Sequence, residues 1–447
     1  MKRIMFAGTN SGCGKTTITC AVLQSLVNRK IDVTSFKCGP DYIDPLFHKN
    51  IIGTPSYNLD SYLFDEETIK YLLIKNSGDI SVIEGVMGFY DGMGFTEKGS
   101  TYDISKITDT DVILVINGRG MSLSLMAQIK GFKEFRDNNI KGVIFNNISE
   151  SVYKSVADEV KKIGLKPLGF MPKLKEIAVE SRHLGLVTPD EIDGLKDKMK
   201  ILSDYAERYI DIDGILELAE NSRDIKTNHE KEHKISDVTI AVTKDRAFCF
   251  IYEDNLNLLR EMGAKIVTFS PLKNEPVPEC DGLIICGGYP EIYASVLERN
   301  QVTLNSVKEN IENGIPCIAE CGGFMYLHDT MEDIGGVKHK TAGIVNGDCY
   351  KTDSLQNFGY MEMCANRDNI LCKKGEIIRA REFHYFKSDS EGDCFTAVKS
   401  NGKTWNLGNE YKNTFASFAH LHFYANTKAA ENFIKHCEEY KCTKQEN

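Results

Sequence analysis

The sequence has no long apolar run and no excess of basic residues. Among its 447 residues, no hydrophobic stretch approaches the roughly 20 residues that cross a membrane. Acidic residues outnumber basic ones, and the net charge of −10 leaves no basic footprint for nucleic acid. The first residues, Met1-Lys2-Arg3, lead straight into an apolar segment without the pattern of a secretion signal. We therefore expect a cytoplasmic protein with neither a membrane nor a nucleic acid as partner.

The chain also lacks paired cysteines. It has 14 cysteines, but none of them forms a Cys-x-x-Cys pair. In a long chain without a secretion signal, such cysteines are expected to stay reduced. We therefore expect neither a disulfide framework nor structural zinc.

There is no internal repeat, and only one polar seam interrupts the chain. A content of 42% hydrophobic and 26% charged residues is typical of globular proteins, and the length indicates two domains. The seam "ENSRDIKTNHEKEHKISD" is rich in charge and lacks apolar periodicity. Strand-like and helix-like segments alternate on both sides of it. We predict an α/β protein with two doubly wound, mostly parallel sheets: a first domain over 1–220, a linker over 221–237 and a second domain over 238–447.

The stretch "AGTNSGCGKTTIT" indicates a phosphate-binding loop with an unusual spacing. The common pattern has four residues between its first glycine and Gly-Lys-Ser/Thr, whereas five residues separate Gly8 from Gly14. An apolar strand-like run precedes the loop and a helix-competent run follows it, so the backbone N–H groups of Gly12 and Gly14 can converge on phosphate oxygens. Lys15 is expected to reach the outer phosphates and the Thr16 hydroxyl to bind magnesium. The alternative is an ordinary strand-to-helix turn rich in small residues.

Acidic residues follow other strand-like segments of the first half. Lys37 precedes Asp41 and Asp44 in "SFKCGPDYIDP", while "SVIEGVMGFYDG" contains Glu84 and Asp91. Ligands of open α/β sheets bind at the carboxyl ends of strands, and magnesium prefers oxygen ligands. The carboxylates are therefore candidates for a magnesium site beside the phosphate loop. Helix caps and turn formers are the alternative roles.

The second half contains a candidate nucleophile. In "PCIAECGGFMYL", Cys321 stands between a strand-like and a helix-like run, with small residues nearby, as in a nucleophile elbow. A helix N-terminus favours a thiolate, and Gly322 can offer its N–H to an oxyanion. "GLIICGGYPEIYA" gives a second strand whose end, including Gly288, is a candidate partner for the same oxyanion. "ASFAHLHFY" supplies His420 and His422 as candidate bases. Core packing is the alternative for each of these side chains.

These motifs resemble known families. The elbow cysteine, the Gly-Gly strand end and the late histidine resemble class I glutamine amidotransferases, and the first half is similar to dethiobiotin synthetase, whose loop has the same five-residue spacing. Joined in this order, "FKCGPDYIDP", "IEGVMGFYDG", "SRHLGL", "AFCFIYEDNL", "GGYPE", "AECGGFMYL", "EFHY" and "HLHF" resemble the cobyrinate a,c-diamide synthase family. The motifs run from Gly8 to Phe423, nearly the whole chain.

The resemblance implies an ATP-dependent ligase that amidates the a and c carboxylates of a corrin precursor of vitamin B12 through acyl phosphates, with nitrogen from glutamine or ammonia. ATP would be bound by Ser11, Gly12, Gly14, Lys15, Thr16 and Thr17, Mg²⁺ by Thr16, Asp41, Asp44 and Glu84, and the corrin by Lys37, Asp91 and Arg182. Cys321 would attack glutamine, His420 would move the proton, and Gly288 and Gly322 would form the oxyanion hole. Ammonia would pass between the domains, shielded from water.

The chain departs from the family patterns in two places. Many class I glutaminases have His-x-Glu, whereas this chain has His420-Leu421-His422 and no carboxylate at that position. The third member of the triad therefore stays unassigned, although the alignment of "FAHL" with the related Tyr-x-His-Gly favours His420. In "RAREFHYF", Ala380, Arg381 and Phe386 replace the usual residues, and contact of this segment with the corrin would alter its fit.

Three alternatives remain at this stage. Partner-binding positioning ATPases share the loop, but they have a lysine where this chain has Asn10. The same amidation chemistry also serves the metal-free hydrogenobyrinate and nickel sirohydrochlorin. The sequence does not select the ring, and it leaves open whether the protein forms a homodimer.

Overall fold

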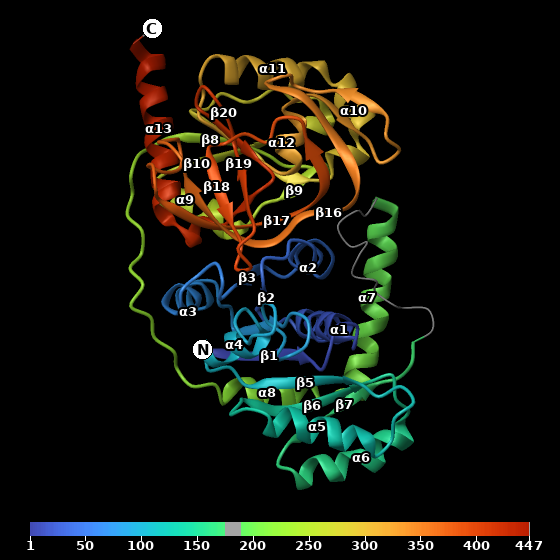
Figure 1. Ribbon diagram of the computed structural model, residues 1–447. Coiled ribbons are helices and arrows are strands. Elements are labelled where there is room, and N and C mark those ends of the chain that lie inside the picture. Colours follow the sequence, from blue (N-terminus) through green and yellow to red (C-terminus); the bar gives the residue numbers. More distant parts are fainter. Residues whose placement is uncertain (175–188, 447) are drawn as a thin grey trace. The chain divides into compact units, whose positions relative to one another are not determined.

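The computed structural model describes residues 1–174 and 189–446 and divides into two compact units, Met1–His229 and Glu230–Asn447 (Figure 1). Residues 222–238 form neither helix nor strand. The division between the units lies inside the segment for which the sequence predicts a linker. The linker limits of 221–237 stay a prediction.

A parallel sheet forms the centre of the first unit. Its seven strands have the order β3-β2-β4-β1-β5-β6-β7. The bounds are β1 Lys2–Gly8, β2 Val33–Cys38, β3 Ser56–Leu59, β4 Ile80–Glu84, β5 Val112–Asn117, β6 Ile140–Asn146 and β7 Lys166–Met171. From β1 the chain first builds one side of the sheet and then, from β5, the other side. The order therefore reverses at β1, where open α/β sheets bind ligands beyond the strand ends.

Helices cover both faces of this sheet (Figure 1). They are α1 Lys15–Asn28, α2 Ile43–Phe47, the π-helix η1 His48–Ile52, α3 Glu66–Lys75, α4 Thr101–Ile107, α5 Ser124–Glu134, α6 Glu150–Lys162, α7 Pro189–Tyr209 and α8 Ile212–Glu220. Side chains cap several of them, as when Asp65 accepts a hydrogen bond from the N–H of Thr68. Just after the end of α1, Arg29 pairs with Glu207 of α7 at 2.6 Å. This ion pair ties the end of the helix that follows the phosphate loop to α7.

The second unit contains a six-stranded sheet in the order β10-β8-β11-β13-β21-β20. Every neighbouring pair in it is parallel except β20 with β21. The bounds are β8 Thr239–Thr243, β10 Lys265–Phe269, β11 Gly282–Ile285, β13 Cys317–Glu320, β20 Asn409–Tyr411 and β21 Thr414–Ser417. With the parallel sheet of the first unit, this confirms the predicted α/β fold class.

Beside this sheet lies a second, largely antiparallel sheet that the sequence analysis did not anticipate. It comprises β14 His328–Glu332, β15 Lys338–Lys340, β16 Val345–Ala365, β17 Ile377–Ser388, β18 Phe395–Val398, β19 Thr404–Leu407 and β22 His420–Leu421, and a separate pair joins β9 Phe248–Phe250 to β12 Gly287–Gly288. Burial alternates along β17, as expected for an antiparallel strand with one solvated face. Strand β22 of this sheet carries His420, one of the two candidate bases.

The helices of the second unit complete its layers. They are α9 Glu253–Glu261, the 3-10 turns η3 Pro271–Lys273, η4 Pro290–Ile292 and η5 Phe423–Ala425, and the helices α10 Ala294–Arg299, α11 Gln301–Glu312, α12 Gly322–Tyr326 and α13 Thr427–Glu446. Helix α12 begins directly after Cys321. The strand-to-helix turn expected around this cysteine is therefore present.

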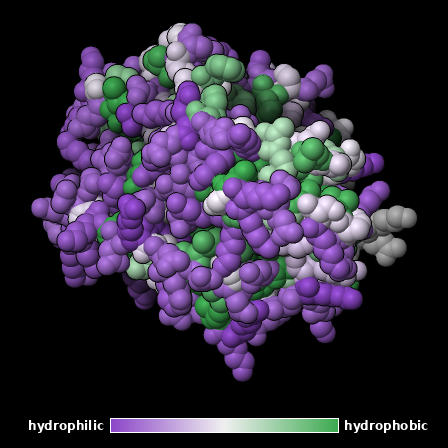
Figure 2. Space-filling view, turned by 90° about the horizontal axis from the view of Figure 1, so that it is seen from below, coloured by the Kyte–Doolittle hydropathy of each residue, from purple (hydrophilic) through white to green (hydrophobic). Residues whose placement is uncertain are grey.

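The surface is mainly polar on the face seen in Figure 2, where hydrophobic side chains stand in small groups. None of the helices within residues 1–174 and 189–446 has the length and apolar composition needed to cross a membrane. All 14 cysteines are free thiols.

Candidate active sites

Close backbone contacts explain the glycines of the phosphate loop. Gly12 and Gly14 have positive φ angles of 79° and 94°. A Cβ on Gly14 would lie 1.8 Å from the side-chain nitrogen of Asn146, which donates a hydrogen bond to the carbonyl of Cys13 at 3.0 Å. A Cβ on Gly8 would lie 2.6 Å from the Cys13 sulfur. The displaced first glycine therefore has a steric reason: the loop folds back onto the end of β1.

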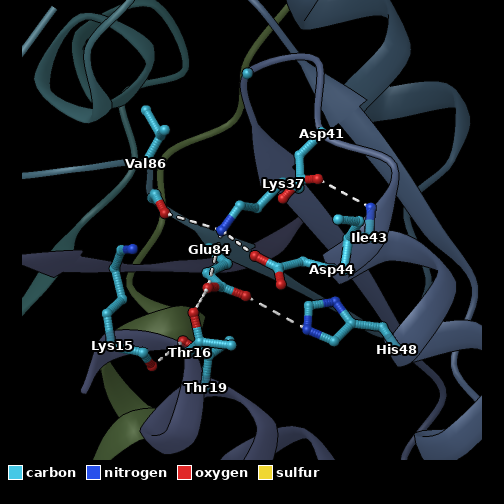
Figure 3. A network of polar contacts seen from close by, with 12 residues as sticks. Lys15, Thr16, Thr19, Lys37, Asp41, Ile43, Asp44, His48, Glu84 and Val86 are labelled. Atoms are coloured by element: carbon cyan, nitrogen blue, oxygen red, sulfur yellow. Dashed lines mark hydrogen bonds and ion pairs between the residues drawn. The ribbon is translucent and has the colours of Figure 1, made fainter. Parts of the chain in front are cut away.

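A buried polar network joins this loop to the neighbouring strands (Figure 3). The Thr16 hydroxyl donates to Glu84 Oε1 at 2.6 Å. The same oxygen accepts from Lys37 Nζ at 2.9 Å, and Lys37 Nζ also contacts Asp44 Oδ2 at 2.5 Å. Lys37, Asp44 and Glu84 are almost completely buried. The start of α1, the ends of β2 and β4 and helix α2 thus converge on one charged cluster.

His48 extends this cluster and was not identified from the sequence. Its Nε2 lies 3.4 Å from Glu84 Oε2, and its Nδ1 lies 3.0 Å from the Ser35 hydroxyl. The histidine is completely buried at the start of η1. No sequence motif marks it, because its partners lie on β2 and β4.

The buried charges of the cluster shift one another's pKa values. Burial raises the pKa of Asp44 to about 6, although the Lys37 ammonium opposes that rise. Burial would also raise the pKa of Glu84, but Lys37, a hydrogen bond from His48 and the charge of Lys15 together hold it well below its usual value. For Lys37, burial is outweighed by Asp44 and Glu84, so its pKa lies well above the ordinary value. Glu84 is therefore an anion and Lys37 a cation around neutral pH.

The oxygen atoms around Glu84 fit a magnesium ion bound together with a nucleotide. Thr16, Asp44 and Glu84 supply the hard oxygen ligands that Mg²⁺ prefers. Within the described residues, Glu84 Oε2 has only the long contact with His48 Nε2 at 3.4 Å, so it can still accept a ligand. The protein alone does not form a complete metal site there, because the described residues contain no group of three or more histidine, cysteine, aspartate or glutamate side chains that could hold a metal ion. Magnesium sites of this kind are completed by substrate phosphates.

The remaining residues predicted to bind magnesium or the corrin lie in different surroundings. Asp41 accepts a hydrogen bond from the N–H of Ile43 at 2.9 Å, and Asp91 accepts one from the N–H of Gly88 at 3.0 Å. Both carboxylates thus hold turns beside the cluster. Lys37, predicted to face the corrin, is buried between two carboxylates. Arg182 lies outside the described residues.

In the second unit, Cys321 stands on a strained turn. Its φ of 47° and ψ of −103° are unusual for a residue with a side chain. The backbone N–H of Cys321 donates to the Ser417 carbonyl at 2.7 Å, which fixes the turn to β21. A Cβ on Gly323 would lie 2.1 Å from the Ile285 carbonyl, so the tight passage of the chain requires glycine there. The nucleophile elbow predicted from "AECGG" has a geometric basis.

The candidate partners of Cys321 lie around it. A Cβ on Gly287 would lie 3.0 Å from His420 Cε1 and 3.5 Å from the Cβ of Cys321. A Cβ on Gly322 would lie 3.1 Å from the backbone nitrogen of Gly288. The structure thus brings together the cysteine, the histidine and the two glycines predicted for the oxyanion hole, from three separate segments of the chain.

His420 and His422 occupy different environments. His420 Nδ1 lies 3.9 Å from Glu320 Oε2, while the His422 ring packs on Tyr252 with centroids 4.5 Å apart. Burial lowers the pKa of His422 to about 3. For His420, burial and then the charges of Arg381 and His384 lower the pKa well below the usual value. Both imidazoles are therefore neutral, and neutral imidazole is the form that accepts a proton.

The thiol of Cys321 is also neutral in this state. Burial raises its pKa, and the negative charge of Glu291 raises it further. This differs from the lowered pKa expected at a helix N-terminus. Helix α12 has only 5 residues, so its dipole is too small to offset burial. The thiol must therefore lose its proton to a base during the reaction.

The segment "RAREFHYF" lies against the strand that carries His420. In β17, Ala380 pairs with Leu421 and Arg381 pairs with His420. On the buried face of β17, His384 Nε2 contacts Glu382 Oε2 at 3.0 Å. The departures at positions 380 and 381 thus lie beside the histidine, and contact of this segment with the corrin stays a prediction.

Comparisons with known proteins match both halves of the chain. Residues 4–187 match the family described as "CobQ/CobB/MinD/ParA nucleotide binding domain", and residues 239–428 match the "CobB/CobQ-like glutamine amidotransferase domain". The match of the second half supports an amide-forming enzyme over a positioning ATPase.

Relatives match along nearly the whole length. A cobyrinate a,c-diamide synthase of Clostridium acetobutylicum is 39% identical over 98% of this chain and 99% of its own. Proteins of the same name are 40% identical in Thermoplasma volcanium, over 98% of both chains, and 40% identical in Fusobacterium nucleatum, over 96% of this chain and 99% of theirs. The chain is a glutamine-dependent amide-forming ligase and belongs to the cobyrinate a,c-diamide synthase family.

Proposed function

We propose that the protein uses ATP to amidate the a and c carboxylates of cobyrinate, with glutamine or free ammonia as nitrogen donor, in cobalamin biosynthesis. The observation that carries this proposal is the full-length similarity to proteins named cobyrinate a,c-diamide synthase. The two polar sites support it, because each contains the groups that one half of the reaction needs.

In the first half-reaction, a carboxylate oxygen of the corrin attacks the γ-phosphorus of ATP, giving an acyl phosphate and ADP. Ammonia then attacks the acyl carbon, phosphate leaves, and the nitrogen loses a proton to give the amide. A free carboxylate would have to expel oxide, so this activation is needed. We assign binding of the ATP phosphates to the loop residues Ser11, Gly12, Gly14, Lys15, Thr16 and Thr17. The loop amides and the Lys15 ammonium complement the negative charge of phosphates.

We assign magnesium binding to the Thr16 hydroxyl and to Asp44 and Glu84, with Asp41 close by. Bound with ATP, magnesium would neutralise phosphate charge. Lys37, Asp91 and Arg182 are the proposed substrate-side residues. For Lys37 this role requires its ammonium to leave one of its two carboxylate partners, and a cation at Glu84 would favour that release.

In the second half-reaction, the thiol proton of Cys321 passes to His420 and the sulfur attacks the carboxamide carbon of glutamine. The amide nitrogen takes the proton from the imidazolium and leaves as ammonia, and a thioester remains. Water then hydrolyses the thioester to glutamate and restores the thiol. We assign stabilisation of the tetrahedral oxyanion to the N–H groups of Gly288 and Gly322.

The direct test offers the protein a panel of rings. The purified protein is incubated with ATP, Mg²⁺, glutamine and either cobyrinate, hydrogenobyrinate or nickel sirohydrochlorin, and the products are weighed by mass spectrometry. We expect the diamide from cobyrinate. If the protein prefers one of the other two rings, the proposed substrate is wrong but the amidation chemistry stands. If no ring gives an amide, the proposal is contradicted.

A second experiment tests the acyl phosphate. Cobyrinate labelled with ¹⁸O in its carboxylates should transfer one labelled oxygen to inorganic phosphate for each amide formed. Unlabelled phosphate would exclude the acyl phosphate while leaving the amidation itself in place.

A further inference from the structure

The candidate base lacks the carboxylate that follows the histidine in many class I glutaminases, but the fold brings another carboxylate to it. Glu320 is the last residue of β13 and directly precedes Cys321. Its Oε2 lies 3.9 Å from His420 Nδ1, although the two residues are 100 positions apart in sequence. Glu320 is 7% exposed and His420 is 2% exposed. A buried carboxyl group thus lies beside Nδ1 of the imidazole.

The orientation of the His420 ring agrees with this contact. Its Cε1 lies 3.0 Å from the Cβ position of Gly287, beside Cys321, while Nδ1 faces Glu320. A hydrogen on Nδ1 directed to a carboxyl oxygen of Glu320 would fix the tautomer in which Nε2 is the nitrogen that accepts a proton.

The strand that carries His420 is held firmly on both sides. Asn255 donates to the Leu421 carbonyl at 2.8 Å and accepts from the N–H of Phe423 at 2.8 Å. The N–H of Ala419 donates to the Ser417 hydroxyl at 2.8 Å. With the backbone fixed in this way, the interaction between Glu320 and His420 depends mainly on their side chains.

We propose that Glu320 is the positioning residue of the glutaminase site: its carboxyl group orients His420 and, once ionised, stabilises the imidazolium that forms when Cys321 loses its proton. This inference rests on the proposed glutaminase roles of Cys321 and His420. The distance is about 1 Å longer than an N–H···O hydrogen bond, and catalytic hydrogen bonds of ligand-free enzymes commonly shorten in the substrate complex. Glu320 would thus serve in place of the carboxylate that many class I glutaminases have two residues after the histidine.

The charges around the pair oppose the transfer of the proton. Burial, Arg381 and His384 oppose protonation of His420, and burial, Glu291, Glu382 and Glu320 itself oppose ionisation of Cys321, so Glu320 is expected to help by stabilising the imidazolium. Burial raises the pKa of Glu320 to about 8, so its carboxyl group is largely protonated in the resting state. A proton on His420 favours ionised Glu320, and the two changes support each other.

The test measures alkylation of Cys321 in the full-length protein. Iodoacetamide resembles the carboxamide of glutamine, and peptide mass spectrometry separates Cys321 from the other cysteines. The rate is followed from acid to alkaline pH for wild type, Glu320→Gln and Glu320→Asp. Asp281→Asn is the matched control, because Asp281 is also buried in the second unit but accepts a hydrogen bond from the N–H of Thr239, at the start of β8.

We expect Glu320→Gln to slow alkylation at neutral pH by about ten- to a hundredfold, to move the rise of the rate to higher pH, and to lower kcat for glutamine hydrolysis with little change in KM. Glu320→Asp should be intermediate and Asp281→Asn should match wild type. If Glu320→Gln does not fold, the Glu320→Asp profile decides, since it keeps the charge but draws it back by one methylene.

Wild-type profiles in both Glu320 variants would overturn the positioning role and leave the proposed function standing. A wild-type Cys321 that reacts no faster than the other buried cysteines would overturn both, because no activated thiol would then exist.

Discussion

Cys321 has a backbone conformation that costs stability. Residues with a side chain in such sparsely populated regions cost about 1–3 kcal/mol each, and φ is 47° here. We predict that Cys321→Gly is more stable than Cys321→Ala by about 1 kcal/mol, because glycine adopts positive φ without a Cβ penalty. Urea unfolding followed by the single tryptophan, Trp405, reports on this unit. Equal stability of the two variants would show that the turn relaxes.

The two late histidines differ in what they contact. His420 lies beside Gly287 and Cys321, whereas His422 packs on Tyr252. We predict that His420→Ala lowers glutaminase kcat by at least about 100-fold and His422→Ala by much less, since only His420 can take the thiol proton. Both variants should keep amidation with concentrated ammonia. The reverse ranking would move the base by two positions.

Glu320 makes stability depend on pH. Below its ordinary pKa of 4.5 the carboxyl is protonated in both the folded and the unfolded chain. As pH rises toward about 8, only the unfolded chain ionises freely, so stability falls over this window by the order of a few kcal/mol.

Glu320→Gln lacks this titration. We predict that its free energy of unfolding, relative to wild type, rises between pH 5 and pH 8.5, while its glutaminase activity falls. A constant difference between the two proteins would contradict the desolvation of Glu320.

At the scale of elements, the phosphate loop depends on β6 as well as on its own glycines. Gly14 meets Asn146, the last residue of β6, whereas a Cβ on Gly12 would have no atom within 4 Å. We predict that Gly14→Ala weakens ATP binding strongly, because it displaces Asn146 and the loop, and that Gly12→Ala costs only about 1 kcal/mol of backbone strain. Calorimetric titration with an ATP analogue compares them. Equal losses would show that strain alone controls the loop.

Local sequence patterns predicted much of the two candidate sites, because the candidate side chains lie at or just after the ends of strands. The phosphate loop and Cys321 each follow a buried strand directly, and Glu84 is the last residue of β4, so residues near in sequence define them. Lys37 is buried between Asp44 and Glu84, and its predicted role toward the corrin stays a prediction. Its position depends on the pairing of β2 with β4, which no local pattern specifies.

Residues that depend on distant contacts escaped prediction. Glu320 stands next to the predicted nucleophile, yet its relation to His420 depends on the pairing of β13 with β21, which places Glu320 opposite Ser417, shortly before His420. The antiparallel sheet also escaped prediction, because its long strands have mixed polarity and resemble surface segments in sequence. The "AECGG" motif already contained Glu320, but only the fold gives it a partner.

At the scale of the whole molecule, the chain joins two units with separate chemistry. The cluster around Lys15 and Glu84 belongs to Met1–His229, and Cys321 with His420 belongs to Glu230–Asn447. We predict that Lys15→Ala removes ATP-dependent amidation with either nitrogen source but leaves measurable glutamine hydrolysis, whereas Cys321→Ala removes only the glutamine-dependent route. Loss of ammonia-dependent amidation in folded Cys321→Ala would contradict two separable sites.

ATP-dependent transfer of glutamine nitrogen to cobyrinate is tested most directly with an isotope label. The protein is incubated with cobyrinate, ATP, Mg²⁺ and glutamine labelled with ¹⁵N in its side-chain amide, and the corrin is analysed by mass spectrometry together with ADP. We predict a diamide with ¹⁵N in both new amides, one ADP for each amide, and no product without ATP. Amides without ¹⁵N, or amide formation without ATP cleavage, would contradict this prediction.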